Sequence, residues 1–339
     1  MGKKNILRSG FFNADRVTLL TVTAVFAVMA VLVYTGNVGR QIQNMLTSVA
    51  CYIVLAVSLN LVVGLLGELS LGHAGFMSVG LFTGCTVAVL LQGKLPVAVC
   101  LPLCMVIGGL AAALVGLVVG LPALRLGGDY LAIVTLGCGE IIKNVLTNLN
   151  IKGTPLQGAL GIDTSSIRRN SKDLLPYAIL LVLLTMLVIM NFKRSKHGRA
   201  IMAIRDNRIA AESIGINITK YKILAFSISA ALAGAAGVLY AHNLSTLTAL
   251  PKNFGYNMSI TILVFVVLGG IGNIRGSVIA AVVLTLLPEL LRFLSDYRML
   301  IYAVVLIVTM ILVWSPGGIA FRERLENMNP FRKKEKEVQ

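Results

Sequence analysis

The chain has 339 residues, of which 57% are hydrophobic and 13% are charged, and its formal net charge is +16. Its apolar runs approach 20 residues, the length of helix that crosses the roughly 30 Å hydrocarbon core of a bilayer. We therefore expect an all-α polytopic membrane protein. The positive charge does not indicate nucleic-acid binding, because the basic residues lie in loops beside the apolar runs, where Lys and Arg set membrane topology.

The apolar runs predict about ten transmembrane helices, some of them broken at glycine. These helices cover residues 17–35, 45–66, 69–91, 96–124, 130–149, 174–192, 223–241, 256–270, 276–291 and 298–315. An even number of spans puts both termini on one side. The positive-inside rule places that side in the cytoplasm, because the two densest Lys and Arg clusters then lie inside. We expect a cytoplasmic N-terminus at 1–16, a transmembrane domain at 17–315 and a basic cytoplasmic tail at 316–339.

A glycine-rich stretch at 60–80 contains Glu68, Ser70 and His73 in otherwise apolar surroundings. An unpaired charge at membrane depth costs about 2.5–3.5 kcal/mol on insertion scales, so such residues usually face a cavity or a partner. Glycine also permits broken helices whose free backbone groups can line a path. Glu68, Ser70 and His73 are therefore candidates for a translocation path, with a discontinuous or re-entrant segment over 69–91. The alternative is that Glu68 and Ser70 cap a helix at a tight inner turn.

The run 96–124 is too long for one helix perpendicular to the membrane. We expect it to tilt, or to break at Pro102 or at the pair Gly108 and Gly109.

The run 130–149 carries Glu140 and Lys143 three residues apart, with Asn144 on the same helical face. An acid and a base at this spacing can neutralise each other, and the amide adds a hydrogen-bonding group. We expect a structural ion pair. In the alternative interpretation, Glu140 and Asn144 belong to a polar patch on the translocation path.

Residues 193–222, called the basic segment below, hold eight Lys and Arg residues within an apolar sequence. On a helical wheel one face is charged and the opposite face is small. The charged face carries Arg205, Arg208 and Glu212, and the small face carries Ala203, Asn207, Ala210 and Ile214. Such a helix suits a groove on another protein, whereas a helix lying on lipid would need Leu, Phe or Trp on its apolar side. We expect a docking helix from about Ala200 to Ile214, bracketed by Gly198 and Gly215.

Residues 256–287 repeat the pattern of the glycine-rich stretch, since two apolar runs flank a break around Gly269, Gly270, Gly272 and Gly276. Two glycine-interrupted regions in opposite halves of a chain point to an internally repeated transporter architecture.

Several functional motifs are absent from the sequence. The chain has no G-x4-G-K-[ST] motif, so it cannot hydrolyse a nucleotide alone. It also has no ligand-spaced His or Cys cluster and no nucleophile elbow. We expect no catalytic residues, no metal site and no bound cofactor in this chain.

Four stretches, at 59–80, 127–149, 197–217 and 259–281, closely resemble the permease subunits of bacterial branched-chain amino acid ABC importers. The resemblance implies the architecture of a type II ABC importer permease in the bacterial inner membrane. It also implies several partners, namely a second homologous permease, two cytoplasmic ATPases that use ATP and Mg, and a periplasmic or extracellular substrate-binding protein.

Within that family the basic segment corresponds to the cytoplasmic coupling loop that contacts the ATPase. Its Ala210-Ala211-x3-Gly215 resembles the E-A-A-x3-G core of importer permeases, although Ile209 stands where the glutamate would be. The outer loop also departs from many relatives, since residues 152–158 replace a T-G-G sequence. The residues expected to couple to the ATPase are Gly198, Arg199, Arg205, Asp206, Asn207, Arg208, Ala210, Ala211 and Gly215.

The resemblance implies a permease for leucine, isoleucine and valine. A permease for urea or short amides is the alternative within the same class, because urea permeases resemble much of the same scaffold. An alternative of a different class is a secondary transporter that uses an ion gradient through Glu68, His73 or Glu140. These residues form no relay chain in the sequence, which disfavours that class.

Overall fold

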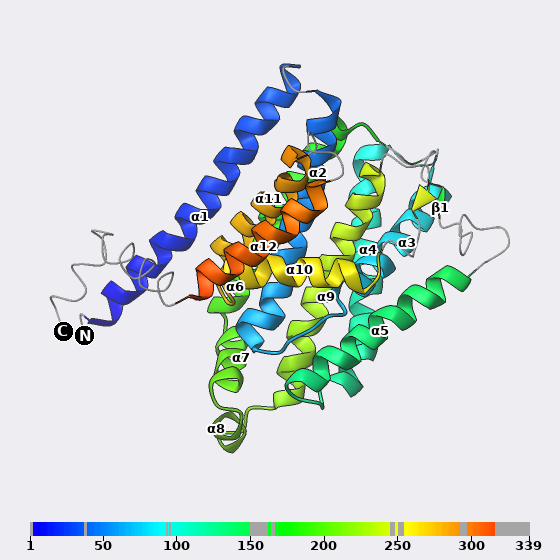
Figure 1. The fold of residues 1–339 in the computed structure, drawn as a ribbon. Helices are drawn as coiled ribbons and strands as arrows, with labels where there is room; N and C mark the ends of the chain where they lie inside the picture. Colours follow the sequence, from blue (N-terminus) through cyan, green and yellow to red (C-terminus); the bar gives the residue numbers. More distant parts are fainter. Residues whose placement is uncertain are drawn as a thin grey trace. The chain divides into compact units, whose positions relative to one another are not determined.

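The computed structural model describes residues 3–36, 39–92, 94, 96–149, 162–163, 167, 169–244, 248–249, 254–291 and 297–315. Nearly all of them are helical (Figure 1). The chain divides into two compact units, Met1–Val282 and Val283–Gln339. Two segments singled out in the sequence, 152–158 and 316–339, lie outside the described residues.

The helices follow the apolar runs of the sequence. Those of the first unit are α1 (Lys3–Tyr34), α2 (Arg40–Asn60), the π-helix η1 (Leu61–Leu66), α3 (His73–Leu90), α4 (Val97–Ala123), α5 (Asp129–Asn148), α6 (Ser171–Arg194), α7 (Lys196–Asp206), α8 (Arg208–Ser213), α9 (Ile218–Asn243) and α10 (Tyr256–Gly269). Helix α11 (Ile274–Leu290) crosses the boundary, and the second unit contains its end and α12 (Arg298–Trp314). Two short strands, β1 (Ile162–Asp163) and β2 (Thr248–Ala249), pair antiparallel.

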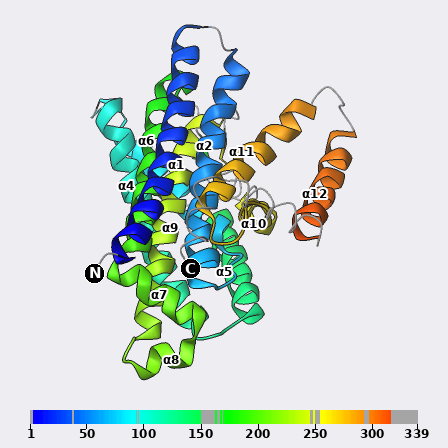
Figure 2. The same ribbon diagram turned by 90° about the vertical axis from the view of Figure 1, so that its left-hand side faces the viewer.

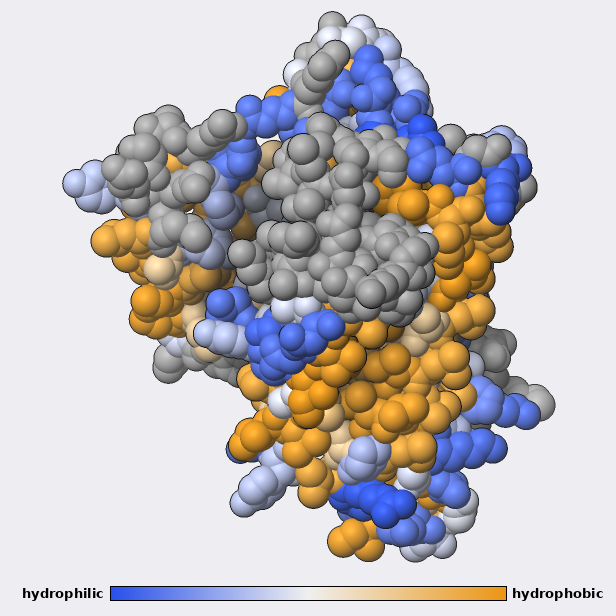
Figure 3. Space-filling model, turned by 90° about the vertical axis from the view of Figure 1, so that its right-hand side faces the viewer, coloured by the Kyte–Doolittle hydropathy of each residue, from blue (hydrophilic) through white to orange (hydrophobic). Residues whose placement is uncertain are grey.

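Each of the ten apolar runs overlaps at least one of these helices, which confirms a polytopic helical fold. Six helical stretches of the described chain are long and apolar enough to cross a membrane, namely Gln41–Leu66, His73–Leu90, Ala98–Ala123, Asp129–Asn148, Ser171–Arg194 and Ile218–Asn243. Three shorter apolar helices cover Thr18–Tyr34, Tyr256–Gly269 and Leu300–Ile311. On the face seen in Figure 3, a broad hydrophobic area has hydrophilic residues above and below it and a smaller hydrophilic patch beside it at mid-height. The number of ten crossings stays a prediction.

Helices α3, α4 and α9 pack against one another through small residues and form the core of the first unit. Helix α3 is buried along most of its length, as expected for a helix without a polar face. At the crossing of α3 and α9, a Cβ atom on Gly80 would overlap the backbone of Gly234. A Cβ atom on Gly108 of α4 would lie 2.7 Å from the carbonyl oxygen of Gly80. Backbones this close require glycine, as in other membrane helix pairs.

Of the two outcomes expected for the run 96–124, a tilt or a break, the break is wrong, because α4 is one continuous helix from Val97 to Ala123 that contains Pro102. Its glycine pair serves packing instead of a bend. A Cβ atom on Gly109 would lie 3.0 Å from the carbonyl oxygen of Ala231 in α9. A proline in a membrane helix is tolerated where neighbouring groups compensate for its missing N–H.

The single docking helix expected from Ala200 to Ile214 is also wrong. The backbone becomes extended at Asn207, with φ −155° and ψ 104°, and divides the region into α7 and α8. The Asn207 side chain accepts a hydrogen bond from the N–H of Ala210 at 3.0 Å and thereby caps α8. The two faces of the helical wheel therefore do not exist as continuous surfaces. Figures 1 and 2 both show α7 and α8 at the lower end of the first unit.

The packing of α3 against α9 makes Gly80 sensitive to a single methyl group. Gly80→Ala is expected to lower the free energy of unfolding by about 1–3 kcal/mol, because the added Cβ atom would force two backbones apart. The thermal unfolding midpoint of the detergent-solubilised protein measures this effect. Gly137→Ala in α5 is the matched control, since a Cβ atom there would meet nothing within 4 Å. An equal loss in both variants would contradict the packing argument.

Candidate functional site

The α-helical geometry of α2 ends at Asn60 and continues directly as the buried π-helical turn η1. All six residues of η1 are buried. Gly67 ends the turn in a left-handed conformation, with φ 78° and ψ 17°, which favours glycine. Residues 67–72, called the break segment below, are not helical, and α3 begins at His73. The discontinuity expected over 69–91 lies at the start of that run, at 67–72, whereas α3 is continuous from His73 to Leu90. Single π-turns such as η1 often mark functional sites.

Side chains from other helices hold the break segment and the start of α3. The N–H of Leu71 donates to the hydroxyl of Thr135 in α5 at 3.0 Å. The N–H of Ala74 donates to the hydroxyl of Ser259 in α10 at 3.1 Å. These contacts satisfy backbone groups that a break in a membrane helix would otherwise leave unpaired.

Glu68 forms an ion pair with Lys222 of α9. The side chains are only 13% and 3% exposed, so the pair is largely removed from solvent. Neither η1 nor α3 receives a side-chain cap, so the capping interpretation is wrong for Glu68 and Ser70. Ser70 is buried, and its hydroxyl has no partner among the described residues.

The sequence pattern does not mark Lys222 as a site residue, because this lysine is the last residue of the basic segment, which is expected to be cytoplasmic. The structure instead buries this residue within α9. One signal was present, since Lys222 immediately precedes an apolar run and Glu68 was a lone acid in another. Two opposite charges at the edges of apolar runs are candidates for pairing.

His73 is the first residue of α3 and is buried. Its Nε2 atom lies 2.8 Å from the hydroxyl oxygen of Ser58 in α2. This hydrogen bond joins the two helices on either side of the break segment.

The second glycine-rich break contacts the first. Residues 270–273 separate α10 from α11, and both Gly270 and Gly272 have left-handed φ angles, 89° and 81°. Asn60, the last residue of α2, donates to the hydroxyl of Ser277 at 2.9 Å and accepts from the N–H of Gly272 at 2.9 Å. A Cβ atom on Gly64 would lie 2.5 Å from the nitrogen of Gly272. The two breaks predicted from the sequence therefore meet at η1.

Arg205 connects the basic segment to the same turn. Its Nη1 atom donates to the carbonyl oxygen of Gly64 at 2.9 Å. Its Nε and Nη2 atoms donate to Oδ1 of Asp206 at 3.1 and 3.0 Å. A Cβ atom on Gly67 would lie 2.6 Å from Cγ of Arg205, so this glycine also makes room for the arginine. The guanidinium thus links α7 to a carbonyl of the buried π-turn.

The other residues of the predicted coupling set occupy two kinds of position. Arg199, Asn207, Arg208 and Ala210 are exposed, and so is Gly215, which ends α8 with φ 85°. Gly198 is buried and donates its N–H to the hydroxyl of Ser195 at 3.1 Å. Ala211 is buried against Ile204 and Ile218.

Ile209 is 82% exposed, so the position that carries glutamate in the related motif presents an apolar side chain.

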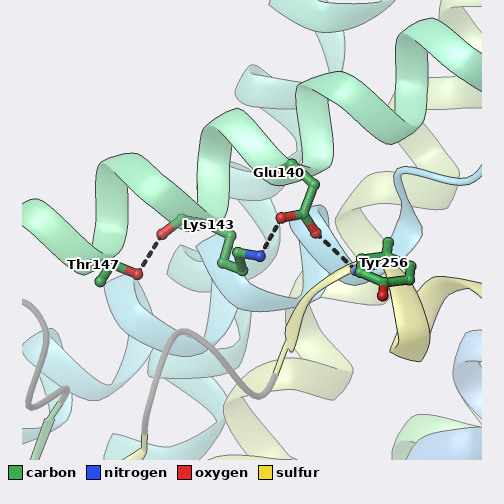
Figure 4. Close-up of polar contacts among 4 residues, drawn as sticks. All are labelled: Glu140, Lys143, Thr147 and Tyr256. Carbon is green, nitrogen blue, oxygen red and sulfur yellow. Dashed lines mark hydrogen bonds and ion pairs between the residues drawn. The ribbon is translucent and has the colours of Figure 1, made fainter.

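Glu140 and Lys143 form the expected ion pair within α5. Oε1 of Glu140 also accepts a hydrogen bond from the N–H of Tyr256, at 2.9 Å, so the pair binds α5 to the start of α10 (Figure 4). Asn144 is exposed. The structure therefore places Glu140 at the α5–α10 contact, whereas Glu68, Ser70 and His73 gather at the break segment.

Comparison with known proteins identifies the family. The family described as "Branched-chain amino acid transport system / permease component" matches residues 41–313. The chain belongs to this family. The permease protein LivM of the high-affinity branched-chain amino acid transport system of Salmonella typhimurium is 37% identical over 311 residues, which cover 83% of this chain and 70% of LivM. LivM of Escherichia coli is 36% identical over 313 residues, with the same coverage.

A more distant relative is the ribose import permease protein RbsC of Haemophilus influenzae, which is 26% identical over 283 residues, 80% of this chain and 84% of RbsC. No solved structure gives a significant match. Membership of the permease family and the apolar helices make this chain a multi-pass transport subunit of the inner membrane.

In this permease, the buried pair of Glu68 and Lys222 predicts a strong asymmetry between single and double substitutions. Lys222→Met alone is expected to lower the free energy of unfolding by about 3–5 kcal/mol, because it leaves a carboxylate unpaired in a buried position. Glu68→Gln together with Lys222→Met is expected to recover most of that loss. Thermal unfolding midpoints in detergent give the comparison. A double variant as unstable as Lys222→Met would contradict a paired role.

Proposed function

We propose that this chain is a transmembrane permease subunit of an ATP-driven importer that moves leucine, isoleucine and valine across the inner membrane. The substrate comes from the two LivM relatives, whose transport system is described for branched-chain amino acids. The same resemblance supports a complex that contains a second permease, two ATPases and an external binding protein. In that complex the ATPases bind and hydrolyse ATP with Mg, and this chain supplies the membrane path.

The single observation that carries the mechanism is the hydrogen bond from Arg205 to the carbonyl oxygen of Gly64. It connects the basic segment, which we place in the cytoplasm, to the point where both glycine breaks meet. A displacement of α7 by an ATPase would therefore act directly on η1. Both termini lie in the cytoplasm in this arrangement, as the distribution of Lys and Arg favours.

The exposed residues of α7 and α8 are the ATPase-facing surface in this proposal. Arg199, Asp206, Arg208 and Ala210 are exposed there. Ile209 and Ile214 are 82% and 75% exposed. An apolar pair this exposed outside the membrane spans suits a partner protein better than water. The ATPase surface that faces Ile209 would then be apolar. In importers with the full motif, the same surface would face a glutamate.

A charge-reversed variant tests the coupling role. Arg205→Glu with Asp206→Arg is expected to leave the complex assembled and to reduce leucine uptake per ATP hydrolysed by about tenfold or more, because a carboxylate cannot donate to the Gly64 carbonyl. The measurement is ATP-driven uptake of radiolabelled leucine, alongside ATP hydrolysis, in vesicles that contain the complete complex.

Lys220→Glu is the matched control, since this residue is also exposed and basic in the same segment. Unchanged uptake in the Arg205 and Asp206 variant would exclude the coupling role. Uptake of urea but not of leucine by the wild-type complex would exclude the proposed substrate. Uptake that persists without ATP and collapses with an uncoupler would indicate an ion-coupled transporter.

A further inference from the structure

The ion pair of Glu68 and Lys222 is incompletely hydrogen-bonded for its degree of burial. Lys222 is 2% exposed, and its ammonium group has three N–H donors. Within the part of the chain that the structure describes, these donors meet one acceptor, Oε1 of Glu68. Two donors on a buried cation therefore remain available.

The acidic side of the pair has unused acceptors as well. Oε2 of Glu68 is buried and has no hydrogen-bond partner among the described residues, and the same holds for the hydroxyl of Ser70. Both residues belong to the break segment, two positions apart. Leaving buried polar atoms unpaired is unfavourable, so each one calls for an explanation, such as an ion or a ligand. The break segment thus offers two buried acceptors without a partner among the described residues, and Lys222 of α9 offers two further N–H donors.

We propose that the Glu68–Lys222 pair and Ser70 form a site for the zwitterionic backbone of an amino acid. The α-carboxylate accepts from the free donors of Lys222. The α-ammonium donates to the carboxylate of Glu68 and to the hydroxyl of Ser70. This inference rests on the proposed function, because it assigns the recognition of that substrate to particular residues.

Charge balance favours a zwitterion over other small solutes. Without a ligand the two side chains neutralise each other, so the buried pair carries no net charge. A zwitterion that enters between them pairs with both, and the site stays neutral. A solute with only one charge would leave Glu68 or Lys222 without a counterion, which is strongly unfavourable in a buried place. A neutral amide such as urea would separate the pair without replacing either charge.

The position of the site also connects it to the coupling contact. Glu68 follows Gly67, against which the side chain of Arg205 packs, and Lys222 lies on a different helix, α9. A shift of the break segment relative to α9 would change the separation of the two charges. ATP-driven movement of α7 would thereby open or close the site.

The test measures ligand stabilisation of the purified permease–ATPase complex in detergent, without the binding protein. The probes are L-leucine, isocaproate, which lacks the ammonium group, and isopentylamine, which lacks the carboxylate. Because a ligand that binds the folded state raises its stability, the unfolding midpoint reports binding. L-leucine is expected to raise the midpoint more than either analogue at equal concentration. Equal shifts for all three probes, or no shift with L-leucine, would overturn the proposal.

Variants assign the effect to the site. Glu68→Gln with Lys222→Met removes both charges together and is expected to abolish the preference for L-leucine. Ser70→Ala is expected to weaken L-leucine binding about tenfold, since it removes one hydrogen bond to a charged group. Thr185→Val in α6 is the matched control, because it deletes another buried hydroxyl without a partner in the described chain.

If the double variant fails to assemble, the comparison of Ser70→Ala with Thr185→Val decides the outcome, and equal L-leucine binding in these two variants refutes the site. The two proposals fail separately. A complex that transports urea instead of leucine contradicts the proposed function. A complex that transports leucine but shows no preference for the zwitterion in this assay contradicts only the site.

Discussion

The arrangement around η1 depends on one constraint, which is that backbone groups released from a helix inside a membrane must find partners within the protein. The break segment meets it with hydroxyls from Thr135 and Ser259. The second break meets it with the side chain of Asn60. The carbonyl oxygen of Gly64 receives the guanidinium of Arg205. Elements far apart in the sequence are therefore held around one turn by the polar groups that the breaks expose.

Local patterns predicted the elements of this fold because their causes are local. The length of each apolar run indicated a helix, and every one of the ten runs overlaps one. The glycine clusters at 60–80 and 269–276 indicated breaks, and the chain leaves helical geometry at 67–72 and 270–273. The spacing of Glu140 and Lys143 indicated an ion pair within α5 because three residues bring side chains together on a helix.

Contacts between distant segments could not be obtained in this way. Glu68 and Lys222 are 154 positions apart, and no periodicity states which helices become neighbours. The meeting of Gly64 with Gly272 is a tertiary contact of the same kind. The division of the basic segment at Asn207 has a different origin, since a helical wheel assumes a continuous helix, whereas an asparagine side chain can cap a new one. The wheel places Asn207 on a helix face and takes no account of its capacity to cap a new helix.

The glycine contacts among α3, α4 and α9 have a mechanical consequence. Where backbone meets backbone at Gly80, Gly108 and Gly234, no side chain can change rotamer to absorb a displacement. These three helices should therefore move together as one rigid body. The parts that can change conformation are then the short non-helical stretches at 67–72 and 270–273. A displacement of α7 would change these two stretches and leave the packing of α3, α4 and α9 as it is.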